Sequence, residues 1–349
     1  MTQPYDSILI VAFGGPEGMA DVMPFLENVT RGRNIPHERL LEVAHHYEGF
    51  GGVSPINEQM RQLIAALQAE LNQHGPHLPI YWGNRNWHPM LPDTLRQMAK
   101  DGCKRAVAFF ASAYSSYSGC RQYRENIEAA RQAAGPDAPL VEKVRVFYNH
   151  PGFIEPMIER VQEAIGQLPT ELQRDAKLVF TAHSIPTSMA AGCRYEWQLR
   201  EASRLVAGGV NRTDWSLVYQ SRSGPPTQPW LEPDVCEHMR ELKKNNAARA
   251  VVIVPIGFIS DHMEVLYDLD HEAKDVCDEI GLPMARAGTV GTHPRFVQMV
   301  RELIVERLTP GSPRPVLGDH PASHDVCPVD CCKPPMRPPT AGAAAPAMR

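Results

Sequence analysis

A histidine and a row of carboxylates each follow directly after an apolar, strand-like run. His183 lies in residues 181–186 (TAHSIP), and Glu264 lies in residues 260–268 (SDHMEVLYD). A neutral imidazole can accept a proton or bind a divalent cation, and carboxylates attract hard or borderline cations such as ferrous iron. This combination predicts chemistry that moves a metal ion in one direction and protons in the other.

The spacing of the carboxylates adds to this prediction. Glu264, Asp268 and Glu272 recur at every fourth position, so an α-helix would place them on one face. Such a stripe is usually a solvated surface, and a lone histidine is usually a core residue. Here the run at 251–259 would deliver Glu264 to the carboxyl edge of a parallel sheet, and the run before His183 would do the same. We therefore expect both groups to meet at one rim.

Short apolar runs alternate with helical patterns along most of the chain. Strands are predicted near Ile8, Ile80, Ala106, Val141, Leu178, Ser216 and Val251. This alternation is typical of α/β proteins with parallel sheets flanked by helices. We predict two Rossmann-like domains, each a doubly wound sheet, at residues 1–148 and 149–310, with a tail at 311–349. The G-x-G-x-x-G spacing of dinucleotide loops is absent.

Composition narrows the class of protein. The chain has 349 residues, 43% of them hydrophobic, and a net charge of −5. No apolar run approaches the roughly 20 residues that span a bilayer, and the N-terminus lacks the layout of a signal peptide. The mild acidity argues against a nucleic-acid partner, which favours a basic stripe. We expect a cytoplasmic enzyme without a membrane span.

Several further segments, in their order and separation, resemble the ferrochelatases, which insert ferrous iron into a porphyrin. They are FGGP at 13–16, RGR at 31–33, GGVSPI at 51–56, YWGNR at 81–85, QSRSGP at 220–225, PWLEPD at 229–234 and the two segments quoted above. The sequences WGNRNW and SRSGPP and a cysteine-bearing tail are similar to the actinobacterial type. That resemblance implies coproporphyrin III as the substrate, bound in a cleft between the domains and converted to Fe-coproporphyrin III (coprohaem) for haem b biosynthesis.

Three other functions stay open at this point. The same reaction on protoporphyrin IX is the nearest alternative, and a cobalt or nickel chelatase acting on another tetrapyrrole is a more distant one. A non-catalytic haem or iron–sulfur sensor on the same fold belongs to a different class. By resemblance, the protein is expected to be a monomer that passes coprohaem to a decarboxylase through a transient contact.

The resemblance also assigns roles to residues. It places His183 and Glu264 at the porphyrin nitrogens, with Asp268 and Glu272 holding or relaying iron. Substrate-binding positions are Arg31, Arg33, Ser54 and Tyr123 at the propionates, with Phe13 and Trp230 as walls of the cleft. Phe13 stands where some relatives have a tyrosine that binds the metal axially. Phenylalanine cannot bind iron, so an axial ligand would have to be water, His183, Tyr114 or Tyr117.

The tail contains a second chemical signal. Cys327, Cys331 and Cys332 lie within six residues of one another, after a Pro-rich connection. By resemblance to actinobacterial relatives, these three and Cys193 are expected to hold a [2Fe–2S] cluster. Zinc is the alternative, although two adjacent cysteines would be strained around one tetrahedral ion. The remaining thiols, such as Cys120, read as ordinary small core or surface residues, and residues after Cys332 as disordered.

Overall fold

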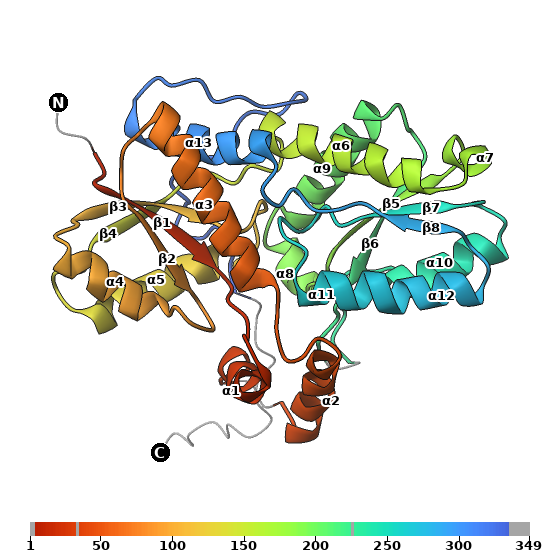
Figure 1. The fold of residues 1–349 in the computed structure, drawn as a ribbon, viewed down its shortest axis with the longest axis horizontal. Helices are drawn as coiled ribbons and strands as arrows, with labels where there is room; N and C mark the ends of the chain where they lie inside the picture. Colours follow the sequence, from red (N-terminus) through yellow and green to blue (C-terminus); the bar gives the residue numbers. More distant parts are fainter. Residues whose placement is uncertain (1–3, 33–34, 225–226, 335–349) are drawn as a thin grey trace, which may run out of the picture.

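The computed structural model of the protein describes residues 4–32, 35–224 and 227–334. Arg33 and most of the predicted disordered end, residues 335–349, lie outside this part of the chain. Two parallel sheets with helices on their faces make up the molecule (Figure 1). The predicted α/β class, with two doubly wound parallel sheets, is confirmed.

The first sheet is built around the first strand of the chain. Its strands are β1 (Ser7–Ala12), β2 (Ile80–Asn84), β3 (Arg105–Phe110) and β4 (Leu140–Lys143). The order is β2-β1-β3-β4, and every pair is parallel. All six residues of β1 are buried. Helices cover both faces of a parallel sheet, which explains why this central strand is a continuous apolar run rather than an alternating one.

The second sheet repeats the arrangement. Its strands are β5 (Lys177–His183), β6 (Trp215–Gln220), β7 (Val251–Val254) and β8 (Met284–Arg286), in the order β6-β5-β7-β8. The seven predicted strands are all present, and β8 is an eighth that the sequence analysis missed. It has only three residues, of which Ala285 alone is buried, so it leaves no apolar run to detect.

Helices pack on the faces of both sheets. The longer ones are α3 (Ile56–His74), α4 (Leu91–Lys100), α5 (Gln122–Ala134), α6 (Pro151–Gln167), α9 (Tyr195–Gly209), α10 (Val235–Lys244) and α13 (Pro294–Leu308). Shorter helices are α7 (Thr170–Gln173), α8 (Thr187–Ala191), α11 (Met263–Val265) and α12 (Lys274–Glu279). Two π-helices complete the set, η1 (Tyr117–Arg121) and η2 (Leu266–Ala273). In the described chain, no helix is long and apolar enough to cross a membrane.

The two sheets share one hydrophobic core. A single cluster of buried side chains includes Phe109 of β3, Phe180 of β5 and Phe296 of α13. Helix α13 belongs by sequence to the second half, yet it packs against α3 and β3 of the first half as well as α6. The loops at the carboxyl ends of the sheets also meet, since the Tyr114 hydroxyl donates to the Ile256 carbonyl over 2.8 Å. The loop after β3 of the first sheet therefore contacts the segment after β7, whose neighbour β5 ends at His183.

Helices α1 (Met19–Val29) and α2 (His37–Glu48) form a unit of their own below both sheets (Figure 1). Their apolar side chains, including Phe25 and Tyr47, enclose Met263 of α11, and Tyr267 of η2 packs against the same cluster. The His46 ring stacks on Tyr267, with ring centroids 4.1 Å apart. Two helices from the N-terminal part of the chain thus cover the start of the acidic helix.

The loop after α2 requires glycine at position 52. Gly52 has a φ of +78°, and a Cβ there would lie 2.3 Å from the backbone nitrogen of Met19. We expect Gly52→Ala to lower the free energy of unfolding by about 1–3 kcal/mol, because it adds a backbone clash to an unfavourable φ. Urea unfolding measures this change. Gly166→Ala in α6, where a Cβ meets open space, is the control and should be neutral or stabilising by up to about 1 kcal/mol. Equal stability of the Gly52→Ala protein and the wild type would contradict the packing of this loop.

Candidate active site

His183 is the last residue of β5, and its ring is one-third exposed. Its Nδ1 contacts the carbonyl of Ser184, so we assign the ring proton to Nδ1. The other nitrogen, Nε2, then carries a free lone pair and lies 3.9 Å from a carboxylate oxygen of Glu264. That distance is too long for a hydrogen bond, but it is within the about 4.2 Å that a metal ion bonded to both groups would span.

A second segment fixes the turn that follows His183. The Ser184 hydroxyl donates to the Leu231 carbonyl over 2.8 Å, and the Leu231 amide donates to Ile185 over 3.0 Å. Trp230 pairs with Pro186 in an isolated bridge. A Cβ at Gly224 would lie 2.2 Å from the Trp230 indole nitrogen, so the chain passes directly over this ring. The predicted wall residue Trp230 therefore lies beside the histidine turn.

The acidic row lies on a helix that is not a simple α-helix, which corrects the prediction. It begins as α11 at Met263, continues as the π-helix η2 and ends as α12. A step of four residues overshoots a full α-helical turn by about 40°, and falls short of a full turn in the wider π-helix. The step from Asp268 to Glu272 lies wholly within η2, and both side chains line one cavity.

Arg286 separates the carboxylates of this segment into two sets. It forms two hydrogen bonds with Asp270 and an ion pair of 2.7 Å with Asp261. Asp268 points the other way, toward the carboxyl end of β6, where it accepts hydrogen bonds from Gln220 (3.1 Å) and from Ser221. Two carboxylates are thus neutralised by a partly buried arginine, while the row that carries Asp268 faces a different surface.

The charge on Asp268 is costly. Burial, together with the neighbouring carboxylates Glu264 and Glu272, raises the pKa of Asp268 to about 7 against the opposing hydrogen bonds from Ser221 and Gln220. Burial also raises the pKa of Glu272, with Asp234 contributing. Asp268 thus gains or loses a proton near neutral pH, and an arriving cation would favour the ionised forms of both carboxyl groups.

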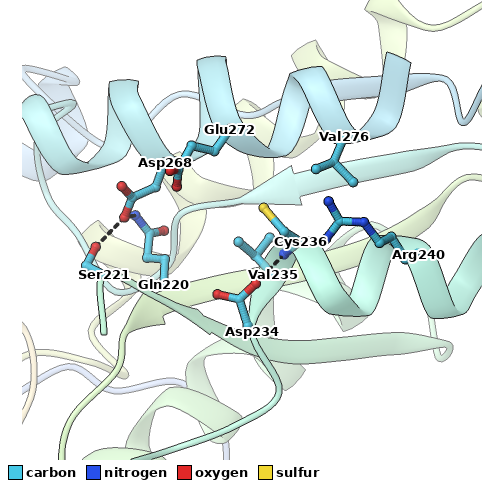
Figure 2. A pocket seen from close by; sticks show the side chains of 9 residues that line it. All are labelled: Gln220, Ser221, Asp234, Val235, Cys236, Arg240, Asp268, Glu272 and Val276. Carbon is cyan, nitrogen blue, oxygen red and sulfur yellow. Dashed lines mark hydrogen bonds between the residues drawn. The ribbon is translucent and has the colours of Figure 1, made fainter. Parts of the chain in front are cut away.

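A cavity of about 410 Å³ lies beside this row. Figure 2 shows Asp268 and Glu272 pointing from their helix toward Gln220, Asp234 and Cys236. The Gln220 side-chain oxygen is buried and has no hydrogen-bond partner in the described chain. Because its amide nitrogen already donates to Asp268, the oxygen is left to accept from a hydrated ion or to bind a cation.

His262 stands between the two reactive groups. Its Nδ1 accepts a hydrogen bond from the Glu264 amide at 3.2 Å, which caps α11. Burial lowers the pKa of His262, Glu264 opposes this, and His183 lowers it again. A neutral ring therefore fixes the backbone of Glu264 without adding positive charge next to His183.

The predicted propionate residues lie at different depths. Arg31 is exposed, directly after α1, while Ser54 is buried against Gly15. Tyr123 is 5% exposed on α5. The Arg85 guanidinium lies over the ring of Tyr123, at 4.3 Å, and near the ring of Phe13, at 5.8 Å. Arg85 thus joins the predicted residues Phe13 and Tyr123, although no prediction included it.

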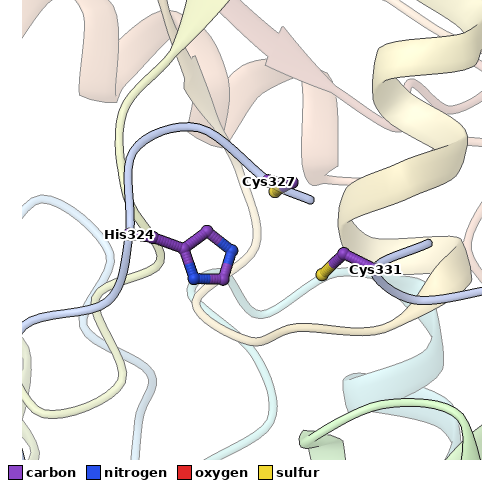
Figure 3. Close-up of side chains that lie close together, drawn as sticks. All are labelled: His324, Cys327 and Cys331. Carbon is purple, nitrogen blue, oxygen red and sulfur yellow. The ribbon is translucent and has the colours of Figure 1, made fainter. Parts of the chain in front are cut away.

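The tail brings the predicted cysteines together. Cys193, Cys331 and Cys332 line one cavity of about 420 Å³, and the sulfurs of Cys331 and Cys332 are 3.5 Å apart. The donor atoms of Cys327 and Cys331 lie within 4.8 Å of each other and of a ring nitrogen of His324 (Figure 3). Thiolates held this closely, from a loop and from the body of the protein, are a plausible set of metal ligands.

Sequence reasoning missed two groups at this site. Cys120, classed above as an ordinary residue, is 4% exposed and hydrogen-bonds to Cys327. This bond holds the pKa of the Cys327 thiol below its usual range, with Lys143 and His324 adding to the effect. Cys120 is far from the tail in sequence, so no spacing reveals the contact. His324 lies three residues before Cys327, and its spacing to the cysteines was a usable signal.

Comparison with known proteins agrees with the geometry. The ferrochelatase family model matches residues 5–308. The chain belongs to the ferrochelatase family. Ferrochelatases are metal chelatases that act on a porphyrin, and such chemistry can use a histidine and a row of carboxylates at one edge of a sheet.

Individual relatives cover nearly the whole chain. A ferrochelatase of Rhodopirellula baltica is 60% identical over 340 residues, which cover 97% of each chain. A coproporphyrin III ferrochelatase of Streptomyces coelicolor is 51% identical over 363 aligned positions, covering 98% of this ferrochelatase chain and 96% of the relative. Among solved structures, SirB from Bacillus subtilis with Fe³⁺ has a TM-score of 0.54 at 12% identity, covering 86% of this chain and 95% of SirB. That last likeness concerns the fold alone.

Asp268 gives the site a measurable pH dependence. Its pKa is higher in the folded than in the unfolded protein, so its stabilising contribution is full below about pH 4 and is lost as the pH rises through about 7. We expect Asp268→Asn to gain stability relative to the wild type between those pH values, because the amide cannot ionise. Urea unfolding at several pH values measures the difference. Exposed Glu279→Gln is the control, and a constant difference for Asp268→Asn across the range would contradict the assigned burial.

Proposed function

We propose that the enzyme inserts Fe²⁺ into coproporphyrin III, giving Fe-coproporphyrin III and two protons in haem b biosynthesis. The observation that carries the proposal is the 3.9 Å approach of His183 Nε2 to Glu264, at the head of the row formed by Asp268 and Glu272. Relatives named coproporphyrin III ferrochelatase, at about half identity over nearly the whole chain, support the choice of porphyrin.

Two kinds of group are needed for this reaction. His183 Nε2 has a free lone pair and can accept a pyrrole proton, and Glu264 opposes it and can take the second proton or meet the metal. Asp268 and Glu272 would pass Fe²⁺ along the helix toward Glu264, since a bound cation offsets the burial and mutual repulsion that make these carboxylates costly to ionise. Because His183 and Glu264 lie 3.9 Å apart, both would act on the same side of the ring plane, with the metal arriving along the carboxylate row and a proton leaving by His183.

The porphyrin edge would be held by the predicted rim. Coproporphyrin carries four propionates, which need cationic and hydroxyl partners. We assign Arg31, Arg33 and Ser54 to them. Tyr123 is buried, so it would not contact a propionate itself but would position the Arg85 guanidinium that lies over its ring. Phe13 and Trp230 would form apolar walls, and energy from these remote contacts would support distortion of the macrocycle.

A water molecule is the favoured axial ligand in this scheme. Phe13 has no donor atom, and the hydroxyls of Tyr114 and Tyr117 already donate to Ile256 and to Glu125. Using either tyrosine would break an existing hydrogen bond.

We also propose that Cys327, Cys331 and Cys332 contribute ligands to a [2Fe–2S] cluster. The convergence of thiols in the tail and the lowered pKa of Cys327 support this. When bound, such a cluster would supply electron transfer or a cross-link between the tail and the body. Cys193 is the fourth ligand expected from sequence, and Cys120 touches Cys327 from the interior. Zinc is the alternative occupant.

We also propose that the enzyme acts as a monomer in the cytoplasm and delivers coprohaem to a decarboxylase.

Two alternatives keep specific support. The Rhodopirellula baltica relative is named simply as a ferrochelatase, so protoporphyrin IX remains the competing substrate. A haem or iron–sulfur sensor would keep the tail site and the fold but would not need His183 to face Glu264.

A metallation assay tests these possibilities. The protein is mixed with anaerobic Fe²⁺ and either coproporphyrin III or protoporphyrin IX, and the rate of metal insertion is followed by the porphyrin absorption bands. We expect the wild type to metallate coproporphyrin III preferentially, and His183→Ala to be slower by about 100-fold or more because a proton acceptor is lost. Exposed His74→Ala is the control and should retain full activity. Preference for protoporphyrin IX would contradict the assigned substrate, and binding without metallation would favour a sensor.

A further inference from the structure

Cys236 has no role in the functions described so far, yet its side chain lines the same cavity as the carboxylate row. It lies in the first turn of α10, where Asp234 caps the helix by accepting hydrogen bonds from the amides of Cys236 (2.8 Å) and Glu237 (3.2 Å). Buried Val235 anchors the same turn in the core. The thiol is therefore held in place at the edge of the cavity, and Figure 2 shows its sulfur pointing toward the helix that carries Glu272.

The charges around Cys236 favour a bound cation. A thiol in the first turn of a helix usually loses its proton more readily, because the helix N-terminus stabilises the thiolate. Here burial, together with the nearby carboxylates, raises the pKa of Cys236 to about 12. The carboxylates are those of Asp234, Glu272 and Asp268, and the opposing charge of Arg240 does not offset them. A divalent cation in the cavity would relieve the repulsion between the thiolate and these acids.

Gln220 adds a buried polar atom without a partner. Its side chain is 1% exposed and lines the same cavity. The side-chain nitrogen donates to the Glu264 carbonyl (3.2 Å) and to Asp268 (3.1 Å), and these two acceptors determine which end of the amide is nitrogen. The side-chain oxygen has no hydrogen-bond partner in the described chain. Because buried amide oxygens are rarely left without a partner, this atom points to a cation or one of its waters as a ligand of the cavity.

The cavity combines one soft donor with several hard ones. Its volume of about 410 Å³ far exceeds the roughly 30 Å³ that one water occupies in the liquid, so it can hold a cation with several of its waters. Carboxylate and amide oxygens suit hard cations such as Mg²⁺, whereas a thiolate selects softer ones. Cys236 therefore adds a preference for thiophilic cations that the carboxylates alone would not have.

We propose that Cys236 is a ligand for thiophilic divalent cations, such as Zn²⁺ and Cd²⁺, at the Glu272 end of the carboxylate row. On binding, a sulfur–metal bond forms, the S–H bond breaks, and the thiol proton passes to solvent. Glu272, the Gln220 oxygen and water supply the other ligands. The inference rests on the proposed use of this row as a path for Fe²⁺. It adds a determinant of metal specificity, because a cation held by Cys236 competes with Fe²⁺ for the row.

Binding of Cd²⁺ alone to the full-length chain tests the site, with the ultraviolet charge-transfer absorption of cadmium–thiolate bonds as readout. The tail cysteines contribute to this absorption in every variant, so variants are compared with the wild type. We expect Cys236→Ser to lose the absorption of one thiolate, because a hydroxyl keeps its proton. The Cys236-dependent absorption should need about 10-fold more Cd²⁺ in Glu272→Gln, which removes one charged ligand. Cys103→Ser is the control and should match the wild type, since Cys103 is buried in the first half of the molecule.

Competition in the metallation assay gives a second readout. Each protein is compared with its own rate of Fe²⁺ insertion in the absence of Cd²⁺. The Cd²⁺ concentration that halves this rate should rise about 10-fold in Cys236→Ser, because the soft ligand is lost, and should stay unchanged in Cys103→Ser.

An unchanged cadmium–thiolate absorption in Cys236→Ser would overturn the inference. Equal inhibition of Cys236→Ser and the wild type by Cd²⁺ would overturn it as well. Failure of the proposed function is distinguishable from these results. A wild type that inserts no Fe²⁺ would contradict the proposed reaction, whereas loss of one thiolate absorption in Cys236→Ser would still support the metal site.

Discussion

The cost of charging a row of carboxylates is the constraint on which the active site depends. Burial is the largest part of this cost at Asp268, and repulsion from Glu264 and Glu272 adds to it. The protein limits this cost through hydrogen bonds from Gln220 and Ser221. In the described chain, Asp268 has no ion pair with a side-chain cation, whereas Asp261 and Asp270 are paired with Arg286. The unfavourable free energy of charging these carboxylates would be reduced when Fe²⁺ binds to them.

The architecture brings this row to the histidine. Parallel sheets present their loops at one edge, and in this molecule the carboxyl edges of two sheets meet over a common core. Helix α13 packs against elements of both halves, and Arg145 forms a buried ion pair with its Glu306 at 2.8 Å. The same arginine donates to the Pro315 carbonyl at the start of the tail. The active site and the tail site are thus both anchored to the joint between the halves.

Sequence reasoning was most successful where an apolar run ended in a reactive residue. Such runs placed His183 and Glu264 on neighbouring strand ends, and the structure brings them to 3.9 Å. It failed where tertiary packing decides the outcome. The three residues of β8 form a strand only because β7 offers a partner. The four-residue spacing of the acidic side chains in the sequence does not distinguish the π-helix η2 from an α-helix.

Long-range contacts were equally invisible in the sequence. Cys120 reaches Cys327 across more than half of the chain, and Tyr123 is buried below Arg85 rather than exposed at a rim. The raised pKa of Asp268 depends on burial, which spacing alone does not reveal. Family resemblance supplied candidate roles, while packing decided which side chains can reach a ligand directly.

The central claim is that His183 and Glu264 form the inner end of a metal path that begins at Asp268 and Glu272. A crystal structure of the protein soaked anaerobically with Co²⁺, a stand-in for Fe²⁺ that can be located by its anomalous scattering, tests it most directly. The account predicts metal at two positions, one in contact with His183 Nε2 and Glu264 and one at Asp268 and Glu272. Metal bound only at other carboxylates, with both of these positions empty at saturating Co²⁺, would contradict it.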